Sequence, residues 1–290
     1  MSRVALCSAK GSPGVTTLSC VMGAVWPAER VVVVAECDPS GGDLAGRFGL
    51  SSRLGMTSLI LTERQGMVEF PDHAAHTQCL PGGMDVLVAP SGADSAMALD
   101  HELGMSSSGI VSGDCDLLAD CGRLLPGAIG QERVIRDSDH TLLLVRADVN
   151  GIAHARWAAS RIGELDPGAV SVVIFGASEF TSEEVAEALG LDVFGVVPFD
   201  PRAAEMACGA SGKTREFVRS VLVAFARQLV TAIMDSGSIA TTHGQRRERR
   251  PRRLAGVGNR HHDLSRTGSV RRTSTPPRLR RDEGSRDTST

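Results

Sequence analysis

The stretch AKGSPGVTTLS, residues Ala9–Ser19, decides how the rest of the chain is interpreted. It follows the apolar run Arg3–Ala9, which predicts a buried strand, and it leads into a predicted helix from about Val15 to Val25. Gly11 and Gly14 allow a ligand to approach the backbone closely, and the N–H groups at the start of a helix attract anions. The stretch therefore predicts a phosphate-binding loop, with an ordinary strand-to-helix turn as the alternative.

The common phosphate-loop pattern, G-x-x-x-x-G-K-[ST], fails here at two positions. Ala9 stands at its first glycine and Val15 at its lysine. Thr16 can still offer a hydroxyl to Mg²⁺, and Thr17 can hydrogen-bond a phosphate oxygen. Losing one preorganised donor at a phosphoryl-transfer site typically costs roughly 10²–10³ in rate, so we expect slow or absent hydrolysis rather than efficient turnover.

Short apolar runs alternate with helical segments along the chain. Further strands are predicted at Arg30–Cys37, Met84–Ser91, Cys115–Gly122, His140–Ala147, Ala169–Gly176 and Asp192–Phe199. Helices are predicted at Ile152–Leu165, Glu183–Leu189 and Arg215–Met234. Continuous hydrophobic runs are typical of strands covered on both faces. The pattern predicts an α/β fold with a mostly parallel central sheet, helices on both faces, and ligand binding beyond the carboxyl ends of the strands.

The composition changes near residue 236. Residues 236–290 contain 14 Arg and five acidic residues, a net charge of +9, so the remainder carries −12 of the total charge of −3. We predict a domain over 1–235 and a disordered Arg-rich tail over 236–290, because the tail lacks the apolar residues needed to offset ordering entropy. Such a tail can bind DNA non-specifically or contact the acidic domain.

The sequence has no membrane-spanning run, no C-x-x-C pair and no cluster of three histidine ligands, and these absences bear on cellular location and metal binding. No apolar run is long enough to span a bilayer, and seven cysteines occur without a C-x-x-C pair, which indicates a reduced, cytoplasmic protein. His73 and His76 lie three residues apart but have no third ligand nearby, so no histidine metal site is expected. Lys213 is predicted to begin a helix that has Glu216 in its first turn.

The phosphate loop resembles the deviant Walker A motif of the ParA/MinD family, K-G-G-x-G-K-[ST]-[ST]. Lys10 falls on that family's signature lysine, which reaches across an ATP-sandwich dimer to the partner's phosphates. Ser12 takes the place of the second glycine and Val15 the place of the second lysine. The positions that match the motif are Gly14, Thr16 and Thr17.

Three further segments resemble this family in the expected order. The segment AECDPSGGD resembles the D-x-D-P-Q switch, with Glu36 on the first Asp and Asp38 on the second, which helps to place the attacking water. The run DLLADCGRL resembles the Walker B strand, whose acid, here Asp120, binds the water shell of magnesium. The segment FGVVPFDP resembles the loop that lies against adenine, which includes Pro198.

The resemblance covers about residues 1–235 and implies a P-loop NTPase of the deviant Walker A type, with ATP and Mg²⁺ as cofactors and an ATP-dependent homodimer. It implies catalytic roles for Lys10 and Asp38 and metal binding by Thr16, Asp38 and Asp120. The cofactor-binding residues it implies are Lys10, Gly11, Ser12, Gly14, Val15, Thr16, Thr17 and Pro198.

The implied role is to position or partition a cargo, either DNA, with the protein at the nucleoid, or an envelope or secretion assembly. Two alternatives stay open. One is a non-hydrolysing scaffold of the same fold, like the TadZ/CpaE-type pilus-localisation proteins. The other is a metabolic enzyme of the wider P-loop superfamily, which we disfavour because no separate substrate motif stands out.

Overall fold

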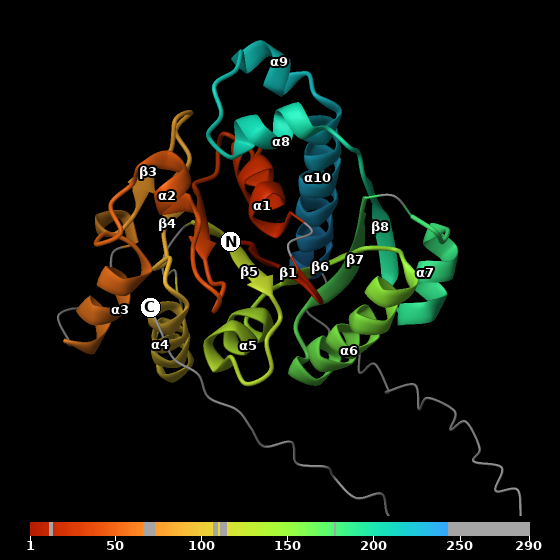
Figure 1. The fold of residues 1–290 in the computed structure, drawn as a ribbon, viewed down its shortest axis with the longest axis horizontal. Coiled ribbons are helices and arrows are strands. Elements are labelled where there is room, and N and C mark those ends of the chain that lie inside the picture. The colour runs from red at the N-terminus through yellow and green to blue at the C-terminus, as the bar shows by residue number, and fades with distance from the viewer. Residues whose placement is uncertain (12–13, 66–72, 107–109, 111–114, 177, 243–290) are drawn as a thin grey trace, which may run out of the picture. The chain divides into compact units, whose positions relative to one another are not determined.

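The computed structural model describes residues 1–11, 14–65, 73–106, 110, 115–176 and 178–242 (Figure 1). Within these residues, eight strands form one sheet in the order β3-β4-β2-β5-β1-β6-β7-β8. The strands are β1 (Arg3–Ser8), β2 (Val32–Glu36), β3 (Gln78–Cys79), β4 (Asp85–Leu87), β5 (Asp116–Arg123), β6 (His140–Val145), β7 (Ala169–Phe175) and β8 (Asp192–Val197). Neighbours pair in parallel except for β3, which runs antiparallel to β4. The mostly parallel sheet confirms the predicted fold class.

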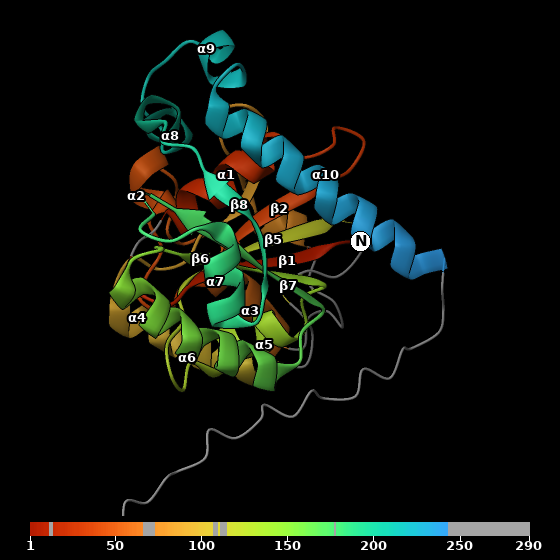
Figure 2. The same cartoon turned by 90° about the vertical axis from the view of Figure 1, so that its right-hand side faces the viewer.

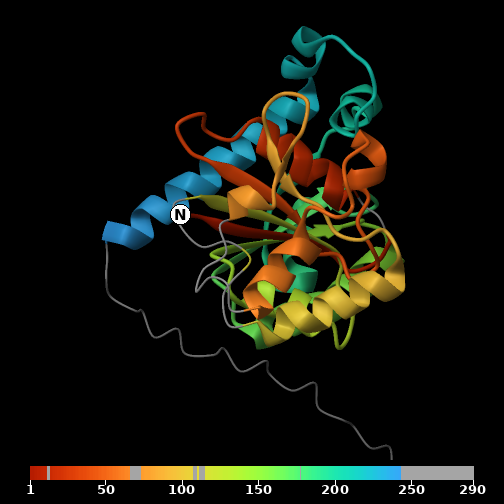
Figure 3. The same ribbon diagram turned by 90° about the vertical axis from the view of Figure 1, so that its left-hand side faces the viewer.

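Helices cover both faces of this sheet. They are α1 (Val15–Ala24), α2 (Leu44–Phe48), α3 (Met56–Arg64), α4 (Ala93–Met105), α5 (Ile129–Arg136), α6 (Val149–Leu165), α7 (Ser182–Leu189), α8 (Pro201–Ala207), α9 (Thr214–Val218) and α10 (Val221–Thr242), with a 3₁₀ turn η1 at His73–Ala75. Figure 2 shows α1 and α10 on one side of the sheet and α4, α5 and α6 on the other. Figure 3 shows the same two layers from the opposite side.

The alternation of side chains along the central strand explains why its sequence is hydrophobic throughout. Val4 and Leu6 of β1 belong to the core beneath α1 and α10, whereas Ala5 and Cys7 belong to the core beneath α4, α5 and α6. Both sets are fully buried. A strand with helices on both faces needs apolar residues at every position, as β1 has.

The C-terminal helical segment differs from the prediction of one helix over Arg215–Met234. Ser220 separates α9 from α10, and its hydroxyl accepts a hydrogen bond from the backbone N–H of Val223 at 3.1 Å. Serine is a favoured helix N-cap, so the chain begins a second helix here. Lys213 precedes α9, whose first turn contains Glu216, as predicted.

Helix α10 continues to Thr242 and so passes the predicted domain boundary at residue 235. The Arg-rich segment 243–290 lies outside the described residues, and the domain boundary, the disorder of the tail and its binding to DNA stay predictions. No helix of the described part of the chain is long and apolar enough to cross a bilayer.

Candidate nucleotide site

The loop between β1 and α1 has the backbone geometry that its glycines predict. Gly11 (φ 47°) and Gly14 (φ 89°) both have left-handed backbone angles, and Gly14 directly precedes α1. A Cβ placed on Gly14 would lie 3.2 Å from a ring carbon of Phe175. No side chain of the described residues caps α1, so its first N–H groups can bind an anion. Ser12, predicted to contact the nucleotide, lies outside the described residues.

Val15 occupies the position where related loops have their lysine. Its side chain is 4% exposed and packs with Leu18 and Val21 in the core between α1 and the sheet. The position therefore contributes apolar contact to the fold and no positive charge to the loop.

A cavity of about 330 Å³ opens beyond the carboxyl ends of β1, β2 and β5. The structure brings seven of the predicted site residues together in its lining, namely Gly11, Gly14, Val15, Thr16, Thr17, Asp38 and Asp120. Residues not assigned to the site from sequence also line it, namely Ser8, Ser40, Gly41, Asp43, Arg47, Gly122 and Arg123, together with Glu36 of the switch-like segment.

Asp120 lies near the end of β5, beside Glu36 of β2 in the strand register. It is 2% exposed, and its carboxylate accepts hydrogen bonds from the Thr16 hydroxyl and from the backbone N–H of Gly122. Burial raises its pKa from 3.8 to about 7, while the Thr16 hydrogen bond acts to lower that pKa. A carboxylate and a hydroxyl at the start of α1 form a donor set suited to hydrated Mg²⁺.

Glu36 braces the switch-like segment from inside the protein. Its Oε1 accepts the backbone N–H groups of Asp43 (2.6 Å) and Leu44 (2.8 Å), and its Oε2 accepts that of Ala89 (2.9 Å). Burial raises its pKa, against the effect of these three hydrogen bonds. The carboxylate therefore ties the start of α2 to the chain that follows β4.

Asp38 lies two residues after the end of β2 and lines the same cavity. It accepts hydrogen bonds from the backbone N–H groups of Ser40 (2.7 Å) and Arg123, and partial burial raises its pKa. Gly122 has a left-handed φ of 55°, and a Cβ there would overlap Asp38 Oδ2. Gly122 is a site residue that the sequence reasoning missed, although an isolated glycine in a strand pattern signals a bulge or a close approach.

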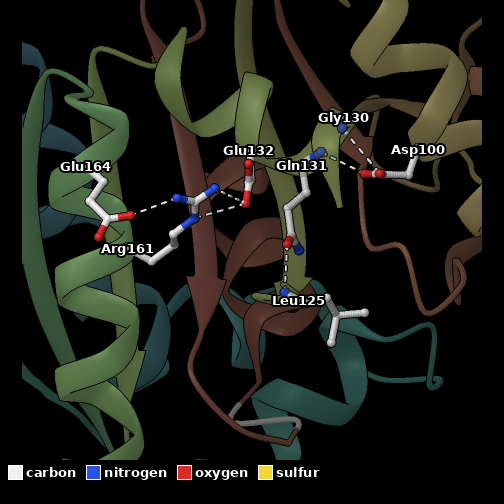
Figure 4. A network of polar contacts seen from close by, with 7 residues as sticks. All are labelled: Asp100, Leu125, Gly130, Gln131, Glu132, Arg161 and Glu164. Atoms are coloured by element: carbon white, nitrogen blue, oxygen red, sulfur yellow. Dashed lines mark hydrogen bonds and ion pairs between the residues drawn. The ribbon is translucent and has the colours of Figure 1, made fainter. Parts of the chain in front are cut away.

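Helix α5 supports the end of β5 through the buried side chain of Gln131 (Figure 4). Its amide nitrogen donates to the carbonyl oxygens of Cys121 (2.5 Å) and Arg123 (2.8 Å), and its amide oxygen accepts the N–H of Leu125 (2.9 Å). Asp100 of α4 in turn accepts the N–H of Gln131 at 2.7 Å. These contacts fix the backbone around Gly122, and no sequence signal identified Gln131.

Lys10 and Pro198 do not line the cavity beyond β1, β2 and β5, and Thr17, which does, has a further contact. Lys10 is exposed and lines a neighbouring cavity of about 420 Å³ together with Arg146 and Phe175. The Thr17 hydroxyl lies 3.3 Å from Cys208 Sγ. Pro198 follows β8 and does not line either of these two cavities. The nucleotide contacts assigned to these residues stay predictions.

The described residues contain no cluster of three or more His, Cys, Asp or Glu side chains that could hold a metal ion unaided. His73 lies in η1, and the Nδ1 of His76 is 2.9 Å from the Ser58 hydroxyl. A divalent cation at Thr16 and Asp120 therefore requires water or phosphate oxygens to complete its coordination.

No protein-family model matches the sequence, and no curated protein sequence matches it. Solved structures do match its fold. The MinD septum site-determining protein of Pyrococcus horikoshii OT3, complexed with Mg-ADP, matches with a TM-score of 0.64 at 14% identity, over 82% of this chain and 98% of that one. A ParA family ATPase from Chlorobium tepidum TLS matches with a TM-score of 0.61 at 13% identity, over 79% and 98%.

An enzyme of different function also matches. Cobyrinic acid a,c-diamide synthase from Mycobacterium smegmatis, with a bound ATP analogue and magnesium, has a TM-score of 0.56 at 14% identity, over 82% of this chain and 96% of that one. The chain therefore has the ParA/MinD-like fold that the sequence motifs predicted. Its nucleotide, partner and task are not fixed by this likeness, because one fold hosts several functions.

Proposed function

We propose that this chain binds Mg·ATP in the cavity beyond β1, β2 and β5, hydrolyses it slowly or not at all, and uses it to control a homodimer that positions a cargo. The Thr16–Asp120 hydrogen bond beneath the uncapped start of α1 carries the proposal. It joins the two groups that hold hydrated Mg²⁺ in phosphate-loop proteins. Bound Mg²⁺ would neutralise negative charge on the phosphates.

Slow turnover follows from the two replacements in the motifs. Val15 has no positive charge for the β- and γ-phosphates. The Glu36 carboxylate is already hydrogen-bonded to three backbone N–H groups. Asp38 remains near Asp120 to orient a water molecule. Phosphoryl transfer depends on positioned charge, so the remaining groups support binding better than chemistry.

Dimerisation is supported by the position of Lys10. It is exposed and lies outside the cavity that contains Asp38 and Asp120, so it is free to reach a phosphate bound by a second copy. Cargo recognition then follows the nucleotide state, with DNA bound through the Arg-rich tail as one candidate. Deleting residues 243–290 should abolish salt-sensitive DNA retention, and unchanged retention would exclude the tail.

The proposal is tested by light scattering and isothermal titration calorimetry on the full chain, with and without Mg·ATP. We expect nucleotide binding, a doubling of mass, and single-turnover hydrolysis far slower than in a lysine-bearing relative. Binding without hydrolysis or dimerisation would favour the TadZ/CpaE-like scaffold. Turnover stimulated by a small-molecule acceptor would favour a metabolic enzyme, and absence of nucleotide binding would refute the proposed site.

A further inference from the structure

The charges that line the nucleotide cavity are mostly negative. Glu36, Asp38, Asp43 and Asp120 supply carboxylates, and the basic side chains among the described lining residues are Arg47 and Arg123. A triphosphate in this cavity needs positive charge beyond one Mg²⁺, because like charges in a partly buried site repel strongly. Val15 cannot supply it.

Arg47 lies at the edge of the cavity beside the first turn of α1. Its Nη2 pairs with Asp43 Oδ2 at 2.5 Å, and its Nη1 lies 3.1 Å from Cys208 Sγ. The same sulfur lies 3.3 Å from the Thr17 hydroxyl. Cys208 thus connects the Arg47 guanidinium to Thr17 of the phosphate loop. The Arg47 side chain is 31% exposed and so accessible to a ligand.

The backbone that carries Arg47 is held in place on both sides. Glu36 accepts the N–H groups of Asp43 and Leu44 at the start of α2. At the other end, a Cβ on Gly209 would lie 3.1 Å from the Arg47 carbonyl oxygen, so the chain after α8 packs closely against α2. This support keeps Arg47 positioned before any ligand binds.

We propose that Arg47 replaces the missing loop lysine as the side-chain cation that binds the nucleotide phosphates. The inference rests on the proposed function. A guanidinium binds phosphate oxygens through two parallel N–H groups, and Arg47 already presents one N–H to a carboxylate, Asp43, in the same cavity. Phosphate binding would exchange the exposed Asp43 pair, which contributes little stability, for a charge-assisted contact with the ligand.

Arg123 is a weaker candidate for this role. Arg123 ends β5 beside Asp38, and no contact of its side chain with the phosphate loop is found among the described residues, whereas Arg47 reaches the loop through Cys208. Lys10 is also excluded in the isolated chain, because it lines the neighbouring cavity. Among these three basic residues, Arg47 is therefore the one best placed to take the role of the absent lysine.

The test measures Mg·ATP, Mg·ADP and adenosine binding to the full-length chain by calorimetry. Arg47→Gln should weaken Mg·ATP binding by about tenfold or more, equivalent to about 1.4 kcal/mol, with little effect on adenosine. Arg47→Lys should recover part of the loss. Arg64→Gln, which removes a surface pair with Glu102, is the matched control and should bind like the wild type.

Asp43→Asn provides a second test in the opposite direction. It releases Arg47 from its resting partner, so it should tighten Mg·ATP binding, and the gain should disappear when Arg47→Gln is added. Wild-type binding that survives Arg47→Gln unchanged, or that is lost in Arg123→Gln instead, would overturn the role of Arg47 alone. Wild-type protein that binds no Mg·ATP would overturn the nucleotide site itself, and this inference with it.

Discussion

Replacing Asp120 separates two quantities: how much its buried carboxylate destabilises the ligand-free fold, and how much it contributes to Mg·ATP binding. Its carboxyl is buried, and burial raises its pKa from 3.8 to about 7. Between these two pH values the folded protein holds a proton that the unfolded chain has released. The free energy of unfolding therefore falls as pH rises from about 4 to about 7, and it stays lower above pH 7, where the buried group is charged.

The magnitude follows from the shift. One pKa unit corresponds to about 1.4 kcal/mol, so a rise from 3.8 to about 7 sets an upper value of about 4 kcal/mol. Asp120→Asn removes the charge and keeps an oxygen that can accept from the Thr16 hydroxyl and the Gly122 N–H. We expect the metal-free variant to be stabler than the wild type by about 2–4 kcal/mol at pH 8 and nearly equal to it at pH 4.

Urea denaturation at pH 4, 6 and 8 without Mg²⁺ or nucleotide measures this difference. Asp85→Asn, at the start of β4, which is separated from β5 by β2, serves as a control for loss of an aspartate elsewhere in the sheet. The stabilised Asp120→Asn variant should also lose the protection that Mg·ATP gives to the wild type. A variant that is destabilised at every pH, or stabilised by the same amount at every pH, would refute the reasoning about the buried charge.

Four further changes probe the same site. Binding of Mg²⁺ with ATP near pH 7 should release protons from Asp120, seen as a calorimetric enthalpy that varies with the ionisation enthalpy of the buffer. Gly122→Ala should destabilise the protein by about 1–3 kcal/mol in thermal unfolding, because the residue has a left-handed φ and contacts Asp38. Gln131→Ala should cost about 1–3 kcal/mol and weaken Mg·ATP binding, because it leaves one buried and two part-buried backbone groups unpaired. Val15→Lys should lower stability without nucleotide and raise the single-turnover rate by about 10²–10³.

The parts of the fold that follow from local sequence were predictable. The strand and helix around the phosphate loop lie within a residue of their predicted ends, at Ser8 and Ala24. Asp120 was predicted at the end of an apolar run, and in the structure β5 continues past it to Arg123. The two-residue strand β3 and the five-residue helix α2 were not predicted, since so few residues show no periodicity, and the break between α9 and α10 within the predicted helix Arg215–Met234 was missed.

The supporting contacts of the site could not be read from sequence spacing. Gln131 meets Cys121 and Arg123 only because α5 packs under the end of β5, and Arg47 meets Cys208 across 161 positions of the chain. Glu36 was expected to act in the switch, but its partners are backbone N–H groups from two other segments. Such contacts depend on how distant elements pack, which no local pattern encodes.

The site lacks the loop lysine but keeps its acidic side chains. Nucleotide binding should therefore depend on the positive charge that Mg²⁺ brings with the ligand. Asp120, Asp38 and Glu36 each have a raised pKa because burial disfavours their charged forms. Metal-free ATP would add further negative charge to this group, with Val15 offering none in return. Mg²⁺ bound with ATP would instead lower the pKa of Asp120 and offset the repulsion. The site should therefore discriminate between Mg·ATP and metal-free ATP more strongly than a loop that carries its own lysine.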